Sequence, residues 1–180
     1  MIARAFFAVC LLLPLTACAA DEDEMGQVTK DFYTAYMAAP HDGIPDAVAR
    51  AKLQPYITPG LEDLLSAGED AEARYAKDTH NESPPIVERD LFTSLFEGAT
   101  AFNVGPCTAE GDAERCAVFL TYDDKSGNPQ HWTDTAILKR TKDGWRIDDI
   151  AYGGHWDFGN KGRLSDTLKF ALKAAAGTAE

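Results

Sequence analysis

Alternating apolar and polar residues run through the C-terminal half of the chain. Two such runs, 131–140 and 145–152, are joined by Lys-Asp-Gly at 142–144, and Asp-Gly between alternating runs is a strong signal for a β-hairpin. Two earlier runs, 100–108 and 114–123, show the same alternation, which is typical of strands. The pattern therefore predicts a four-stranded antiparallel meander.

The N-terminal half has the spacing of helices instead. In 25–38 the apolar residues recur at i, i+4, i+7 and i+8, which places them on one face of a helix. Asp46 is placed to cap a short helix that ends near Leu53, and Thr58-Pro59 is a start signal for a longer one. The first part of the domain is therefore predicted to be helical.

Two further segments complete the apolar pattern. Ser165 is placed to cap a last helix, in which Leu164 and Leu168 share one face. Segment 90–96 is predicted as a short apolar helix or turn whose large side chains, Phe96 among them, enter the core. Helices, then a meander, then a closing helix give the α+β class, with N-terminal helices packed on a curved antiparallel four-stranded sheet.

Four stretches of the chain carry a resemblance. They are Asp-Phe-Tyr-Thr-Ala-Tyr at 31–36, Tyr-Ile-Thr-Pro at 56–59, Asp-Gly-Trp-Arg-Ile-Asp-Asp-Ile at 143–150 and Leu-Ser-Asp-Thr-Leu at 164–168. In this order they resemble a family of small exported bacterial domains without an assigned activity. The resemblance implies a cystatin-like, nuclear transport factor 2-like cup. Such cups host enzymes, binding modules and scaffolds alike, so the fold does not fix the function.

The first residues have the form of an export signal. A single positive charge, Arg4, precedes an apolar core over 5–15 that is too short to span a bilayer. The sequence Leu-Thr-Ala-Cys at 15–18 resembles the bacterial lipobox. The resemblance implies cleavage before Cys18 and acylation of its sulfur and its amine, and such acyl chains would anchor the domain to a membrane.

The lipobox sets both the expected location and the division of the chain. Ala19 stands where a retention signal would place Asp, which by the same resemblance points to the periplasmic face of the outer membrane. Ala-Cys-Ala at 17–19 also fits ordinary secretion, which would give a soluble periplasmic or secreted protein. The predicted units are a signal peptide (1–17), a lipidated, acidic and disordered tether (18–25) and a single α+β domain (26–180).

The chain is strongly acidic. It has 29 acidic and 17 basic residues, for a net charge of −12. Nucleic-acid binding needs a basic footprint, so we exclude that class of function, together with electrostatic docking on anionic lipid. The four histidines are scattered and complete no set of metal ligands. We therefore predict neither a metal nor a cofactor.

Cys107 and Cys116 are predicted to form a disulfide, because an even pair of cysteines in an exported chain is typical of one. With Gly111-Asp112 at the tip of a hairpin, the two cysteines face each other at a non-hydrogen-bonded site. The Cα atoms there approach to about 4.5 Å, which a disulfide tolerates. Pro106 has no N–H to donate next to this pair, so we expect the strand pairing to loosen there or the strand to form an edge of the sheet.

A turn of even length between the last two strands would place Asp134 and Asp149 on one face of the sheet. With Tyr122 or His131 nearby, the pair could lie in the mouth of the cup, where an apolar setting tunes a carboxylate to act as a general base. The competing interpretation leaves both aspartates at strand ends, solvated or paired with arginines. A three-residue turn would instead move each side chain of one strand to the opposite face of the sheet, so that the two aspartates would no longer share a face.

His155, Trp156 and Phe158 put aromatic side chains on a glycine-rich segment after the last strand. Exposed aromatics on a loop are typical of contact surfaces, so these residues are candidates for partner contact. The alternative is that Trp156 and Phe158 fill the bottom of the core.

No motif for nucleophilic catalysis is present. The leading hypothesis is an envelope-anchored lipoprotein that serves as a non-enzymatic binding module for a small apolar ligand or a protein partner, including partners of the inhibitor or immunity type. The alternative is a small-molecule lyase or isomerase that uses carboxylates in the cup. A deep cavity lined by Asp134 and Asp149 would favour the enzyme, whereas a filled cup with exposed Trp156 and Phe158 would favour the binding module.

Overall fold

The computed structural model describes residues 16–38, 42–110 and 113–177. The apolar core of the predicted signal, the predicted hairpin tip at 111–112 and the side chain of Cys18 lie outside the described part. The elements in chain order are α1 (Thr16–Met37), α2 (Ala47–Leu53), the short 3-10 helix η1 (Gln54–Tyr56), α3 (Pro59–Asp78), β1 (Ala101–Glu110), β2 (Ala113–Tyr122), β3 (Gln130–Thr141), β4 (Gly144–Ala151) and α4 (Leu164–Gly177).

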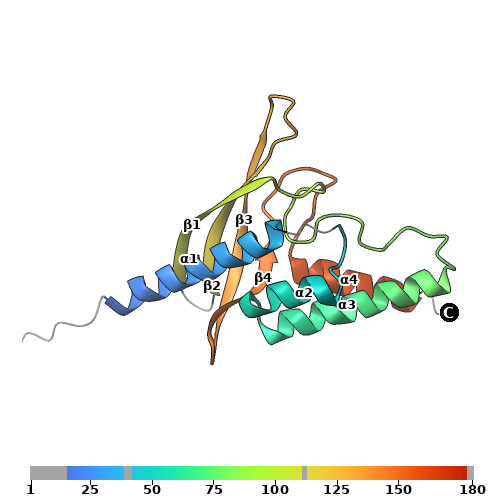
Figure 1. Cartoon of the computed structure of the whole chain (residues 1–180), viewed down its shortest axis with the longest axis horizontal. Coiled ribbons are helices and arrows are strands. Elements are labelled where there is room, and N and C mark those ends of the chain that lie inside the picture. The colour runs from blue at the N-terminus through green and yellow to red at the C-terminus, as the bar shows by residue number, and fades with distance from the viewer. Residues whose placement is uncertain (1–15, 39–41, 111–112, 178–180) are drawn as a thin grey trace, which may run out of the picture.

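The sheet is the predicted antiparallel meander. Its strand order is β1-β2-β3-β4, and the strand bounds differ from the predicted ones by one or two residues. In Figure 1, α1 crosses the sheet, whereas α3 and α4 lie side by side next to it. The predicted α+β class is confirmed, with helices before the sheet and one closing helix after it, and the sheet is open.

The side chains of α1 fill the space between this helix and the sheet. α1 contacts β1, β2 and β4. Phe32, Tyr33 and Tyr36 are at most 2% exposed, and they pack edge to face on one another and on Phe92. Offset and edge-to-face contacts of this kind add to the free energy of burial. The interior of the predicted cup is therefore filled by aromatic side chains.

α1 begins earlier than the sequence predicts. Residues 19–24, expected as a disordered tether, belong to the helix. Alanine has the highest helix propensity, and Ala19 and Ala20 precede the acidic residues. Asp21 then forms an ion pair with Arg140 of β3, which holds the start of α1 to the sheet.

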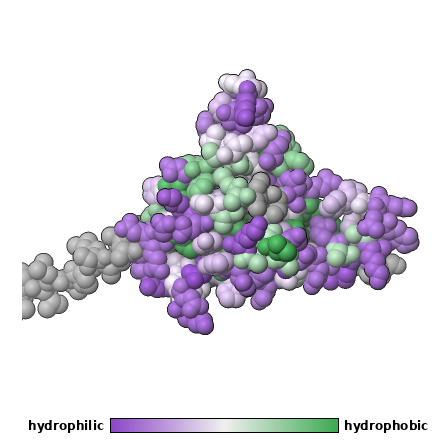
Figure 2. All heavy atoms as spheres, in the orientation of Figure 1, coloured by the Kyte–Doolittle hydropathy of each residue, from purple (hydrophilic) through white to green (hydrophobic). Residues whose placement is uncertain are grey.

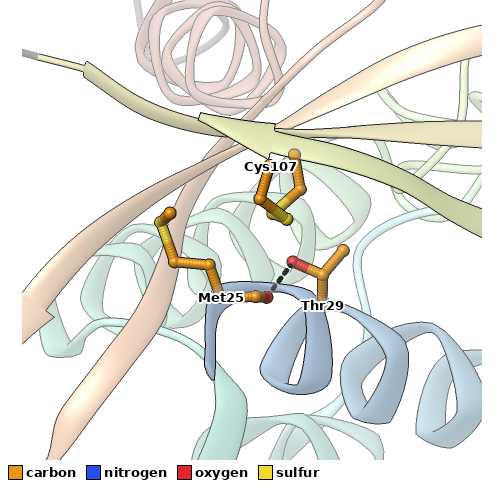
Figure 3. Close-up of a disulfide and its surroundings, with 4 residues drawn as sticks. Met25, Thr29 and Cys107 are labelled. Atoms are coloured by element: carbon orange, nitrogen blue, oxygen red, sulfur yellow. Dashed lines mark hydrogen bonds between the residues drawn. A yellow bond between two sulfur atoms is a disulfide. The ribbon is translucent and has the colours of Figure 1, made fainter. Parts of the chain in front are cut away.

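The disulfide between Cys107 and Cys116 joins β1 to β2 as predicted, with the Cα atoms 4.0 Å apart. The two cysteines face each other in the strand register, and the register shifts just before Cys107. Pro106 lies in this irregularity, so the expected loosening of the strand pair is confirmed. Figure 3 shows the disulfide against the turn of α1 that carries Met25 and Thr29. The cross-link therefore lies where α1 rests on the sheet.

One face of the sheet is covered by α1 and the core, and the opposite face is more exposed. At its outer edge, β4 forms isolated bridges through Ile147 with Ile57 and through Ala151 with Arg163, and such cover protects an edge strand from pairing with other chains. On the face away from α1, Phe119 is 45% exposed. Figure 2 shows a mainly hydrophilic surface with smaller hydrophobic areas.

Segment 90–96, predicted as a short helix or turn, is an irregular loop that is mostly buried. Leu91 and Phe92 enter the core as predicted, but Phe96 is 37% exposed, so its predicted place in the core is wrong. The Asp90 side chain accepts hydrogen bonds from two backbone N–H groups of the loop. Local bonds of this kind compete with helix formation and account for the irregular backbone. We refer to its buried part as the 90–95 loop.

Candidate functional site

Asp134 is fully buried on the core face of β3. Its carboxylate accepts hydrogen bonds from the Ser94 N–H at 2.8 Å, the Gly153 N–H at 2.8 Å and the Trp132 indole N–H at 3.1 Å. The Ser94 hydroxyl is a fourth donor. Burial raises the pKa of Asp134, and these hydrogen bonds act in the opposite direction. The carboxylate thus ties the 90–95 loop and the segment after β4 to the middle of the sheet.

Asp149 lies on the other face of the sheet. The register of β3 and β4 shifts by one residue at Asp148, so Asp149 lies opposite Ile137, while Ile150 lies opposite Ala136 on the core face. A one-residue bulge reverses the alternation of a strand beyond it. The prediction that Asp149 shares a face with Asp134 is therefore wrong.

Asp149 caps the N-terminus of α4. Its carboxylate accepts a hydrogen bond from the Ser165 N–H at 3.0 Å and one from the Ser165 hydroxyl at 2.7 Å, and the Arg163 guanidinium lies 4.0 Å away. The side chain is buried. The sequence predicts Ser165 as the cap, but Ser165 is the second residue of α4. The long-range partner Asp149 supplies the capping acceptor in its place.

Tyr122 and His131 lie at the end of the sheet where β2 leads into β3. Tyr122 is half-buried and packs against the core, whereas His131 is exposed, with its Nδ1 3.0 Å from the Thr121 hydroxyl. The strand register places these two side chains on opposite faces. The structure therefore does not bring the four candidates, Asp134, Asp149, Tyr122 and His131, together into one pocket.

A second buried carboxylate, Asp90, organises the 90–95 loop. One oxygen accepts hydrogen bonds from the Phe92 N–H at 2.9 Å and the Thr93 N–H at 2.8 Å, and the other accepts from the Tyr36 hydroxyl. Burial raises the pKa of Asp90 to about 7, against the effect of the loop hydrogen bonds. Gly98 has a positive φ of 80°, and a Cβ there would stand 2.8 Å from the carboxylate, so this approach requires glycine.

The carbonyl groups of the 90–95 loop are also paired. The Asn160 side chain, 3% exposed, donates to the carbonyls of Asp90 and Thr93 at 2.7 Å each. The hydroxyls of Tyr33 and Tyr152 donate to two more loop carbonyls, at 3.2 and 2.6 Å. Buried polar groups that satisfy one another fix a single conformation. We therefore assign this network a structural role.

In the segment after β4, some aromatic side chains pack against the core and others lie at the surface. Trp156 is half-buried and packs against the core, with its ring centroid 5.2 Å from that of Trp132. His155 is exposed and stacks on Trp156 at 4.6 Å. Phe158 is 56% exposed. Of the two alternatives for this segment, core packing holds for Trp156 and surface exposure holds for Phe158.

Three exposed phenylalanines lie around Arg89. The Arg89 guanidinium stands 5.9 Å from the centroid of the Phe96 ring and donates to the Phe158 carbonyl at 3.4 Å. Phe170 of α4 is 62% exposed and lines a pocket together with Arg89. We refer to Arg89, Phe96, Phe158 and Phe170 as the Arg89 surface. Its members come from three segments that only the fold brings together.

The pocket at the Arg89 surface has a volume of about 320 Å³. Its other lining residues include Ile86, Lys161 and Asp166. Within the described part of the chain, neither Arg89 nor Lys161 forms an ion pair with a carboxylate. Arginine and aromatic side chains next to a partly apolar pocket are typical of the residues that dominate binding energy at protein interfaces.

The sequence predicts only one member of the Arg89 surface. Phe158 is a predicted contact residue, whereas Phe96 is assigned to the core and Arg89 and Phe170 carry no assignment. For Phe170 a signal exists, because this residue follows Leu168 by two positions and so falls outside the apolar stripe of its helix. Arg89 has no such signal in its local sequence.

Two features are lacking among the described residues. In ranges 16–38, 42–110 and 113–177, no group of three or more His, Cys, Asp or Glu side chains is placed to hold a metal ion. Within the same ranges, no helix has the length and apolar character needed to cross a membrane.

No protein-family model, curated protein or solved structure matches the chain.

Proposed function

We propose that this chain is a lipoprotein of the bacterial cell envelope, anchored through Cys18, that acts as a non-enzymatic binding module for a protein partner. The proposal rests on the contrast between a filled interior and exposed aromatic side chains at the surface. The interior between α1 and the sheet is filled by aromatic side chains, whereas Phe96, Phe158 and Phe170 remain exposed around Arg89. A folded domain that keeps large apolar side chains at its surface favours contact with another molecule.

The hydrogen bonds of the two candidate catalytic carboxylates, Asp134 and Asp149, support a binding function over a catalytic one. Asp134 accepts hydrogen bonds from Ser94, Gly153 and Trp132, and Asp149 holds the start of α4. Each carboxylate is already engaged in holding the fold together. The lyase or isomerase alternative gains no support from these positions.

The chemistry of the Arg89 surface favours a particular kind of partner segment. Arg89 and Lys161 lack carboxylate partners among the described residues, and apolar rings stand beside them. A segment with an acidic residue next to an apolar one would complement both features. Because the chain as a whole carries a net charge of −12, an acidic segment would be repelled elsewhere, which favours binding in one orientation.

The position of the proposed anchor is compatible with this surface. Cys18 falls in the first turns of α1, and Figure 1 shows the start of α1 and helix α4 toward opposite ends of the long axis. Phe170 belongs to α4. A lipid chain at Cys18 would therefore leave the Arg89 surface open to a partner in the periplasm.

The location is tested by the intact mass of the protein purified from the membrane fraction. We expect a chain that begins at Cys18 and carries three acyl groups, with a mass that rises by two hydrogen atoms on reduction of the disulfide. A soluble product that begins at Ala20 would remove the lipid anchor from the proposal.

The binding surface is tested by retrieval of envelope proteins with the tagged full chain. Arg89→Ala and Phe158→Ala should each weaken binding of the retrieved partner by about tenfold or more, the effect typical of central interface residues. Arg115→Ala and Phe119→Ala are matched controls, because both residues are exposed on the other face of the sheet. Equal loss of binding in all four variants, or in none, would contradict the proposal.

A further inference from the structure

A groove of about 450 Å³ lies between α3 and the segment that returns along it, over residues 81–87. Its apolar lining includes Ile44, Ala73, Pro85 and Val87. A volume of this size, with an apolar wall next to polar side chains, is compatible with a small-molecule site. The groove is separate from the pocket of the Arg89 surface, which lies against α4, although Val87 borders both.

The walls of the groove are held in place by specific contacts. The Glu72 carboxylate of α3 accepts hydrogen bonds from the Ile86 N–H at 3.0 Å and the Val87 N–H at 2.8 Å. On the other side, the Gly43 N–H donates to the Arg89 carbonyl at 3.0 Å. Gly43 has a φ of 76°, and a Cβ there would stand 2.7 Å from the Val87 carbonyl oxygen, so this close approach requires glycine. A wall fixed in this way reduces the entropy that a ligand must overcome.

Three carboxylates line the groove, and their charges differ in compensation. Glu69 pairs with the buried Arg50 guanidinium. Glu72 is bonded to backbone N–H groups alone, and Asp42 is exposed without an ion pair among the described residues. Within the described part of the chain, therefore, no cation forms an ion pair with either of these two carboxylates, which lie beside an apolar wall.

We propose that this groove is a binding site for a small amphipathic cation, an amine with an apolar body. The body would lie against the apolar wall that includes Ile44 and Val87, and the ammonium group would be balanced by Asp42 and Glu72. A neutral apolar ligand would reduce the hydration of the carboxylates without replacing it, and an anion would be repelled. The proposal is independent of the partner surface around Arg89, and either could fail without the other.

Three probes with one apolar body separate the effect of charge from that of shape. They are 4-phenylbutylamine, 4-phenylbutanol and 4-phenylbutyrate, each titrated into the isotopically labelled full chain and followed by backbone amide chemical shifts. The amine should bind about three- to fivefold more tightly than the alcohol, as expected for a partly exposed ion pair, and the acid should bind least. The amide signals of Ile86 and Val87 should move with the amine, because their N–H groups bond to Glu72.

Two variants at exposed positions test the site itself, and each has a matched control. Asp42→Asn should abolish most of the preference for the amine over the alcohol, whereas Asp70→Asn, exposed on α3 outside the groove, should leave it unchanged. Ala73→Phe should fill the groove and abolish binding, whereas Ala51→Phe on α2 should not. Equal affinity for the three probes, or binding that survives Ala73→Phe, would overturn the proposal.

Discussion

Asp134 of β3 and Asp149 of β4 lie on opposite faces of the sheet, because the register shift at Asp148 reverses the alternation of β4 beyond it. Each carboxylate holds a different part of the fold. Asp134 binds the 90–95 loop and the segment after β4, and Asp149 caps α4. The alternating pattern predicts that the two aspartates form one catalytic pair. In the folded chain they are separate, and each has a structural role.

The role of Asp134 predicts a large loss of stability on its removal. Asp134→Ala would leave the N–H groups of Ser94, Gly153 and Trp132 buried without an acceptor. We expect the free energy of unfolding to fall by about 3–5 kcal/mol. Asp134→Asn keeps one acceptor oxygen and should cost less, about 1–3 kcal/mol. Urea denaturation measures both, with the exposed Asp157→Ala as the control, and a loss below about 1 kcal/mol for Asp134→Ala would contradict the assigned role.

The capping role of Asp149 predicts a smaller, local effect. Asp149→Ala removes the acceptor for the Ser165 N–H and hydroxyl, and loss of a cap costs about 1–2 kcal/mol. Hydrogen exchange should show faster opening of the first turn of α4 than in the parent chain, while the amides of β2 stay protected. Asp143→Ala, at an exposed turn, is the control. Unchanged exchange in α4 would rule out the cap.

The buried Asp90 carboxyl predicts a pH dependence of stability. The pKa of Asp90 is about 7 in the folded chain, against an ordinary value of 3.8. Between these values the folded state keeps a proton that the unfolded state has lost, so its contribution to the free energy of unfolding falls as pH rises from about 4 to about 7 and then levels off.

The variant Asp90→Asn isolates this effect. Its side-chain oxygen can still accept from the Phe92 and Thr93 N–H groups, but the group does not titrate. The fall in melting temperature between about pH 5 and about pH 8 should therefore be smaller in Asp90→Asn than in the parent chain. Identical slopes in the two proteins would show that Asp90 does not titrate in this range.

The disulfide between Cys107 and Cys116 predicts a response to reductant. The bond closes a loop of sequence separation nine, for which loss of the cross-link costs about 2–3 kcal/mol. A reductant should lower the melting temperature of the parent chain to that of the double variant Cys107→Ser, Cys116→Ser, and should not change the variant. An equal response of both proteins to reductant would exclude a contribution of the bond to stability.

The sheet could be predicted because its signals are local. Alternation of apolar residues located each strand, and counting outward from the turn predicted at 111–112 placed Cys107 opposite Cys116, as the register shows. The missing N–H of Pro106 even located the irregularity in β1. These inferences needed only the pleat of a strand and the geometry of a short turn.

The sequence-based predictions are wrong or incomplete where the position of a residue is set by a partner that is distant in the sequence. The bulge at Asp148 has no local signature, yet it changes the face of Asp149. The start of α1 is held by Asp21 through its contact with Arg140, far away in the sequence. The Arg89 surface combines residues before β1, after β4 and on α4. Such juxtapositions follow from the packing of elements, which a periodic pattern does not specify.

The central claim is that the Arg89 surface binds a protein partner, and site-specific photo-crosslinking at position 158 in living cells tests it most directly. The probe p-benzoylphenylalanine would replace Phe158, which is 56% exposed, and in a second strain Phe119, which is 45% exposed on the other side of the sheet. The account predicts one discrete cross-linked species from position 158, lost on Arg89→Ala, and none from position 119. No cross-link at 158, or the same products from both positions, would contradict it.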